Sequence, residues 1–172
     1  MAHEPEAESG SRIESTSEEA DQSEEVFAIY RSEFTARLVE VLFRDRTPAI
    51  WACNANADEV ERMAEKPGAE LAEIIVAFNA LSGGKGTPQL VLESVDRDTA
   101  EISVANAEVL TRRMGTTGAE CFLAGATFSL TSVPGIDYVW FEFEEGEHAA
   151  PGRYSRARFP YLWPLGSGET ED

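Results

Sequence analysis

The chain has 172 residues, of which 42% are hydrophobic, and a formal net charge of −18. This length and hydrophobic content are typical of one domain with a real core. The acid excess argues against a general nucleic-acid surface, because phosphate binding requires clustered cations. No run of about 18 apolar residues occurs, so the sequence predicts no membrane span.

The acidic residues are most concentrated at the two ends of the chain. Residues 1–25 hold nine acids and one base, and residues 169–172 hold three acids. We expect disordered acidic tails over 1–25 and 166–172, on either side of a domain over 26–165. The N-terminal residues show neither a signal-peptide pattern nor an anchoring cysteine, so the default expectation is a cytoplasmic protein. Acid excess with only two lysines is typical of a halophile, although a GC-rich genome would also deplete lysine.

The first half of the domain is predicted to contain both helices and strands. Apolar residues at helical spacing predict a helix over about 24–35, and a β-rich run predicts a strand over about 37–44. A turn over 45–48 leads to a strand over 49–54. The charged residues 57–66 predict a short helix, for which Asn56 is a possible cap. An amphipathic helix over about 67–82 follows, and strands over 90–95 and 100–104 form a hairpin.

Another helix is predicted over about 118–132. Thr117 and Glu120 have the spacing of a capping box at its start. Gly125 and the alanines near it allow the helix to approach another element closely. We expect this small-residue face to pack on the sheet, next to the helix over about 67–82.

A turn and a strand follow that helix. Pro134-Gly135 ends the helix. In the next strand, Tyr138 and Trp140 alternate with Val139 and Phe141. We expect the latter two to face the core, which places Tyr138 and Trp140 on the opposite face of the sheet.

This helix–turn–strand unit resembles the GerMN domain, a family named for a spore-formation and germination protein. The matching residues are Gly115, Glu120, Leu130, Thr131, Pro134, Gly135, Ile136, Asp137 and Val139. The likeness extends more weakly back to about Val41. Members of the family often lie outside the cytoplasmic membrane, and the resemblance transfers no active site. Together with the predicted elements, it implies an α+β domain with two principal helices on one face of a mainly antiparallel sheet.

Several chemical signatures are absent or weak. The segment from Gly83 to Thr87 has glycine after its lysine and closes a helix, so it is a helix-to-strand loop rather than a phosphate loop. His148 is interpreted as a surface residue, and no Cys or His spacing predicts a metal site. Asp137, in the Pro-Gly-Ile-Asp turn, is expected to bond nearby backbone N–H groups rather than to act in catalysis. We predict no cofactor.

Cys53 and Cys121 are the only cysteines in the chain. Both lie in apolar surroundings, which favours two buried free thiols. A disulfide requires the two elements to be adjacent, which the sequence does not show.

The segment over residues 151–166 reverses the charge of the chain, because arginines and aromatic residues alternate there without acids. One interpretation, which we favour, is a strand or strap added to the domain's own sheet. The other is a docking surface, since Arg, Tyr and Trp are enriched at binding hot spots. The candidate partner-binding residues are Tyr138, Trp140, Arg153, Arg156, Arg158, Tyr161 and Trp163.

These observations favour a non-enzymatic, GerMN-like binding or scaffold module. Its expected partner is a protein or a cell-envelope component. The alternative is a small carboxylate-dependent hydrolase or carbohydrate-acting enzyme, which would need two acids in one cleft. The sequence favours the binding module over the enzyme because it shows no convergent set of nucleophile, base or metal-ligating residues.

Overall fold

The structure is a computed structural model that describes residues 46–56, 59–159 and 162–165, the last three by their backbone. The chain divides into two compact units, Met1–Arg37 and Leu38–Asp172, and all described residues belong to the second. The helix expected over 24–35, the strand expected over 37–44 and the tails expected over 1–25 and 166–172 lie outside the described residues.

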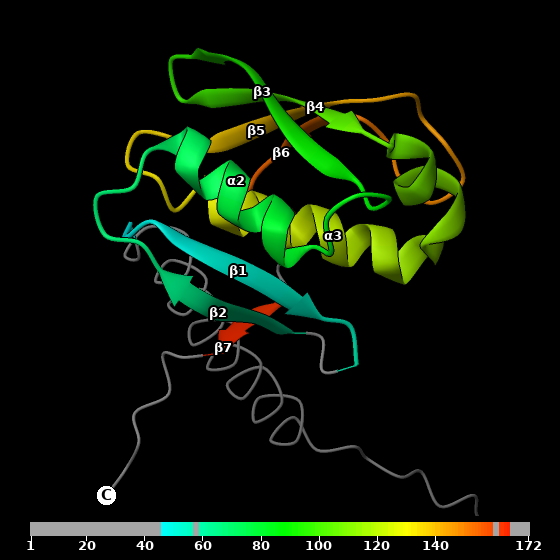
Figure 1. The fold of residues 1–172 in the computed structure, drawn as a ribbon, viewed down its shortest axis with the longest axis horizontal. Helices are drawn as coiled ribbons and strands as arrows, with labels where there is room; N and C mark the ends of the chain where they lie inside the picture. The colour runs from blue at the N-terminus through cyan, green and yellow to red at the C-terminus, as the bar shows by residue number, and fades with distance from the viewer. Residues whose placement is uncertain (1–45, 57–58, 160–161, 166–172) are drawn as a thin grey trace, which may run out of the picture. The chain divides into compact units, whose positions relative to one another are not determined.

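The described strands form two sheets (Figure 1). The three-stranded sheet has the order β1-β2-β7, with β1 at Ala49–Asn54, β2 at Glu59–Glu65 and β7 at Trp163–Leu165. The four-stranded sheet has the order β3-β4-β5-β6, with β3 at Gln89–Asp96, β4 at Thr99–Ala105, β5 at Tyr138–Glu142 and β6 at Gly152–Tyr154. The pairs β2/β7 and β4/β5 are parallel, and the other pairs are antiparallel.

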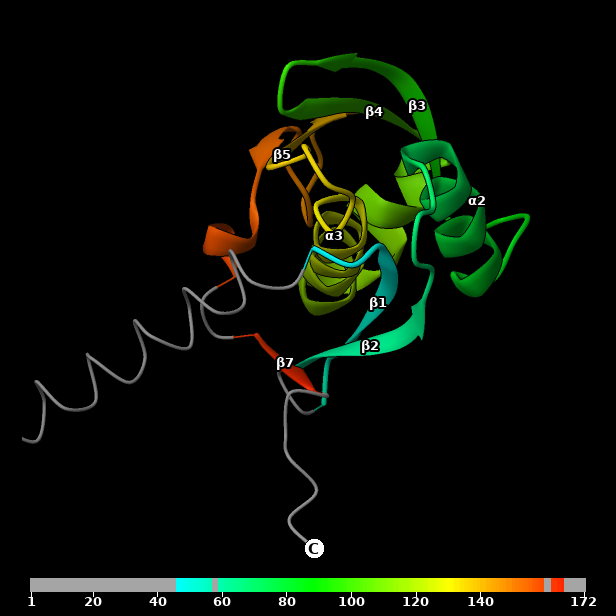
Figure 2. The ribbon, with the colours of Figure 1, turned by 90° about the vertical axis from the view of Figure 1, so that its left-hand side faces the viewer.

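Helix α3 (Gly115–Leu130) lies between the two sheets, and α2 (Leu71–Leu81) packs beside it (Figure 2). Ten of the sixteen residues of α3 are buried, as expected for a helix that is covered on all sides. The α+β class and the mainly antiparallel pairing are therefore confirmed. The two helices do not lie on one face of a single sheet, because the described strands are divided between two sheets.

One line of residues, Cys121, Gly125, Ser129 and Ser132, runs along α3 and its end toward β1; we call it the α3 stripe. The backbone N–H of Trp51 donates to Ser129 Oγ at 2.9 Å, and that of Ala49 donates to Ser132 Oγ at 2.9 Å. These bonds lie on the side of β1 away from β2. The stripe therefore takes the place of a neighbouring strand.

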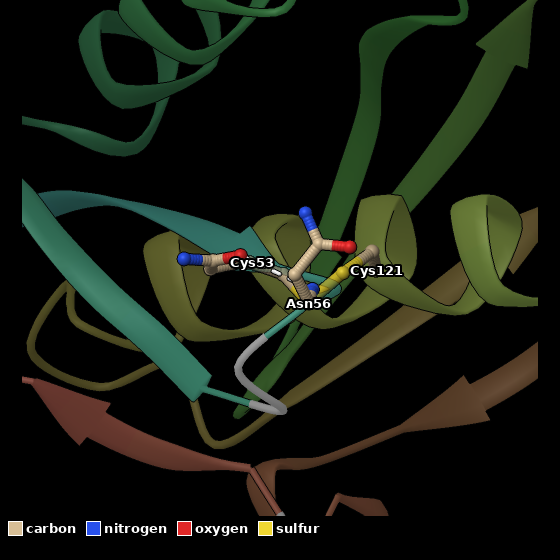
Figure 3. Close-up of a disulfide and its surroundings, with 4 residues drawn as sticks. Cys53, Asn56 and Cys121 are labelled. Atoms are coloured by element: carbon tan, nitrogen blue, oxygen red, sulfur yellow. Dashed lines mark hydrogen bonds between the residues drawn. A yellow bond between two sulfur atoms is a disulfide. The ribbon is translucent and has the colours of Figure 1, made fainter.

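A disulfide joins the other end of the stripe to β1 (Figure 3). Cys53 and Cys121 are 68 residues apart in sequence, and their Cα atoms are 5.1 Å apart. The expectation of two free thiols is therefore wrong. It failed because each cysteine has ordinary apolar neighbours in sequence, whereas the pairing depends on how β1 lies against α3.

A side chain of helix α2 likewise forms hydrogen bonds with the backbone of the edge strand β3. The Leu90 N–H donates to Asn79 Oδ1 at 2.8 Å, and Asn79 Nδ2 donates to the Leu90 carbonyl at 2.9 Å. One amide side chain thus satisfies both backbone groups of a strand residue.

Two local predictions are wrong. Residues 59–65 form β2 rather than a helix, because pairing with β1 and burial of Val60 outweigh local charge patterning. Thr117 and Glu120 do not cap α3, since a π-helix over Val109–Arg113 leads into it and the N-cap is Met114. The strand at 49–54, the helix that begins after Pro67 and the hairpin over 89–105 agree with the sequence analysis.

A substitution at Gly125 tests the close contact between α3 and β1. A Cβ atom there would lie 3.1 Å from the Trp51 carbonyl oxygen and 3.5 Å from Phe78 Cε2. Gly125→Leu should lower the free energy of unfolding by about 1–3 kcal/mol, because overpacking outweighs the gain in helix propensity. Thr117→Leu, at an exposed position of the same helix, should change it by less than about 0.5 kcal/mol. Chemical denaturation measures both, and equal stability of the two variants would contradict the predicted contact.

Candidate functional site

Strand β5 separates a buried face from an exposed one. Val139 and Phe141 are fully buried, whereas 47% of the surface of Trp140 is exposed. Tyr138 is half-buried and lies on the same side as Trp140. The predicted alternation is therefore confirmed.

Arg153, one of the candidate partner-binding residues, lies beside this face. In the β5–β6 register it lies opposite Trp140, and its guanidinium carbon is 3.5 Å from the centroid of the Tyr138 ring. Its Nη2 is also 3.8 Å from Asp98 Oδ1. The outer face of β5 thus contains an arginine stacked on a tyrosine, with a carboxylate nearby.

Arg156 is buried, with 4% of its surface exposed, so its predicted place on a partner-facing surface is wrong. Its Nε donates to Thr131 Oγ1 at 2.9 Å, and its Nη2 donates to the Phe128 carbonyl at 3.0 Å. These acceptors lie at the C-terminal end of α3, where unpaired carbonyls and the helix dipole favour a cation. Arg156 is therefore a structural residue that closes the end of the helix.

Burial, together with the smaller effect of the neighbouring cations Arg46 and Arg62, lowers the pKa of Arg156 to about 9. The side chain remains charged at neutral pH. Because its pKa in the folded state is below its ordinary value, the unfolded chain holds this proton more tightly. Burial of the charged guanidinium therefore lowers the free energy of unfolding by its full amount at neutral pH. This cost declines only as pH rises through about 9, where the folded protein begins to lose the proton.

The remaining predicted residues are distributed between surface and core. Arg158 is exposed and lies 4.0 Å from the ring centroid of buried Tyr154, whose hydroxyl donates to the Ala150 carbonyl. Tyr161 lies outside the described residues, and Trp163 is described only as part of the β7 backbone. Since Tyr154 is part of β6 and β7 pairs with β2, this segment adds strands to both sheets, as the strap interpretation expects.

A pocket of about 200 Å³ adjoins Tyr138. Its lining includes Arg46, Asp98, Thr131, Asp137, Ser155 and Arg156. Arg46 Nη2 is 2.5 Å from Asp137 Oδ1, and Arg46 Nη1 donates to the Ile136 carbonyl at 3.1 Å. Asp137 is thus held by a distant arginine instead of the turn backbone that we expected. No local sequence pattern could have identified Arg46 as its partner.

Other candidate chemistry is not assembled in the described part of the chain. Within it, no group of three or more His, Cys, Asp and Glu residues could hold a metal ion. His148 Nδ1 lies 3.2 Å from Thr116 Oγ1. The segment from Gly83 to Thr87 connects α2 to β3, as predicted. No described helix is long and apolar enough to span a membrane.

No family model, curated protein or solved structure matches the chain. The GerMN resemblance therefore stays a prediction. The site must be interpreted from its own geometry.

The contrast between two arginines tests the assignment of Arg156. Arg156→Ala removes the donors to Thr131 and Phe128 and leaves a cavity, so it should lower the free energy of unfolding by about 2–4 kcal/mol. Arg158→Ala, at an exposed position, should cost less than about 1 kcal/mol. Urea unfolding compares the two, and an Arg156→Ala variant as stable as the wild type would show that this side chain does not hold the end of α3.

Proposed function

We propose that this chain is a non-enzymatic, GerMN-like binding or scaffold module. Its partner is a protein or a cell-envelope component that docks on the outer face of β5, around Tyr138, Trp140 and Arg153. The observation that carries this proposal is the exposure of Trp140, which retains 47% of its surface in a strand whose adjacent residues are fully buried. A large exposed aromatic side chain on a rigid strand is typical of a binding hot spot.

The local geometry supports the same proposal. Arg153 is already stacked on Tyr138 and held near Asp98. A preorganised side chain loses less conformational entropy when a partner binds. The helix–turn–strand order of α3, Pro134-Gly135 and β5 also agrees with the resemblance to the GerMN domain.

A carboxylate-dependent hydrolase or carbohydrate-acting enzyme is the second candidate. The observation that favours it is that Asp98 and Asp137 line one pocket. However, Asp137 is ion-paired with Arg46 at 2.5 Å, so its carboxylate is already engaged by a side chain of the fold. The binding module is therefore the better-supported function.

The disulfide bears on where the protein works. Stable disulfides are typical of oxidising compartments and rare in a reducing cytosol. The Cys53–Cys121 bridge thus favours an oxidising compartment over the cytoplasmic default. The extracytoplasmic location of many GerMN proteins agrees with this proposal.

Trp140→Ala tests the proposed function. Because the side chain is half-exposed, its removal should change the free energy of unfolding by less than about 1 kcal/mol, while weakening partner binding by about 2 kcal/mol or more. The matched control is Val76→Ala, on α2, where Val76 is 69% exposed. The measurement combines thermal unfolding with quantitative recovery of partners from native lysate. A folded Trp140→Ala protein that retains every partner of the wild type would eliminate this surface.

A further inference from the structure

The outer face of the four-stranded sheet contains two aromatic rings in different electrostatic environments. The first is Tyr138, whose ring is covered by the Arg153 guanidinium at 3.5 Å, with Asp98 at 3.8 Å from that guanidinium. This side of the face already forms a complete set of aromatic ring, cation and carboxylate. It shows which chemistry the face accepts.

The second ring is that of Trp140, which has Arg153 beside it on β6 and carboxylates beside it on β4 and β5. In the parallel β4–β5 register Glu101 lies opposite Trp140, and Glu142 follows two residues later on the same face. Both glutamates are exposed. Within the described residues, neither forms an ion pair with an arginine or a lysine.

Neighbouring serines hold two carboxylates at this face. Ser94 Oγ donates to Glu101, and Ser103 Oγ donates to Glu93 on the adjacent strand. Ser103 itself lies opposite Glu142 in the β4–β5 register. The three acids therefore lie on neighbouring strands close to the Trp140 position, whereas Arg153 is already stacked on Tyr138.

We infer that the partner presents a basic segment and places an arginine side chain over the Trp140 ring, next to Glu101 and Glu142. This inference rests on the proposed function and specifies the chemistry of its partner. The Arg153–Tyr138–Asp98 set is the internal precedent for the same contact. Charge complementarity supplies the second argument, because a guanidinium gains from both the aromatic face and the carboxylates.

The experiment is a titration of the full chain with ten-residue Gly/Ser peptides that carry three arginines, three lysines or three glutamates. The readout is the indole N–H resonance of Trp140, identified by its loss in Trp140→Ala. Apparent Kd values come from peptide fluorescence anisotropy, so that the variant lacking this indole can also be measured. We expect the arginine peptide to shift this resonance and the glutamate peptide to leave it unchanged. Binding should weaken with added salt, because exposed charges are screened.

Variants separate a specific contact from attraction to an acidic protein. Trp140→Ala should weaken binding of the arginine peptide about tenfold, and Glu101→Gln or Glu142→Gln about two- to fivefold. The matched control is Glu61→Gln, an exposed acid on β2, which should change the affinity by less than about 1.5-fold. Equal losses in Glu61→Gln and Glu101→Gln would overturn the inference, as would an equal response to the glutamate peptide.

The result also distinguishes this inference from the proposed function. If Trp140→Ala loses the native partners but no basic peptide binds at Trp140, the partner is not basic, and only this inference is overturned. If Trp140→Ala retains the native partners, the proposed function fails and this inference fails with it. Specific binding of the arginine peptide, together with loss of the native partners in Glu142→Gln, supports both.

Discussion

The backbone N–H groups of β1 on the side away from β2 need hydrogen-bond acceptors although no described strand lies there. The rest of the structure depends on how α3 and its C-terminal end supply these acceptors. Ser129 and Ser132 accept the N–H groups of Trp51 and Ala49, and Gly125 lets the helix come close enough for these bonds to form. A buried N–H group left unpaired would cost about 1–3 kcal/mol, so each hydroxyl matters to stability. Asn79 of α2 likewise forms hydrogen bonds with the backbone of β3. Because polar side chains on helices take the place of strands, both sheets can share one core.

The same helix positions the proposed binding face. The carbonyl of Phe128 and the hydroxyl of Thr131, at the C-terminal end of α3, accept the guanidinium of Arg156. Arg156 lies two residues after β6, so this contact fixes the end of the strand that pairs with β5. That pairing places Arg153 over Tyr138 and leaves Trp140 exposed on the outside of the sheet. The proposed binding face is therefore preorganised by contacts in the core.

Periodic patterns were sufficient to predict the parts of the fold that are held by one continuous stretch of sequence. The apolar spacing of α2, the hairpin of β3 and β4 and the alternation in β5 are of this kind. The errors concern contacts between distant residues. Cys53 and Cys121 form a disulfide, residues 59–65 pair with β1 as a strand, and Arg156 turns inward to the end of α3. In each case the local sequence is compatible with two outcomes, and only the tertiary partner decides between them. Strand alternation was sufficient to predict that Tyr138 and Trp140 share the outer face of β5, whereas no local pattern indicated the pairing of Arg46 with Asp137.

The most direct measurement of the central claim is native-state hydrogen exchange at the Trp51 amide in Ser129→Ala. If Ser129 replaces a neighbouring strand, loss of its hydroxyl should accelerate exchange at Trp51 by about tenfold or more. The Leu90 amide, which is held by Asn79, should keep its wild-type rate and so report any general loss of stability. Unchanged protection at Trp51 in a folded Ser129→Ala protein, or equal acceleration at Trp51 and Leu90, would contradict the account.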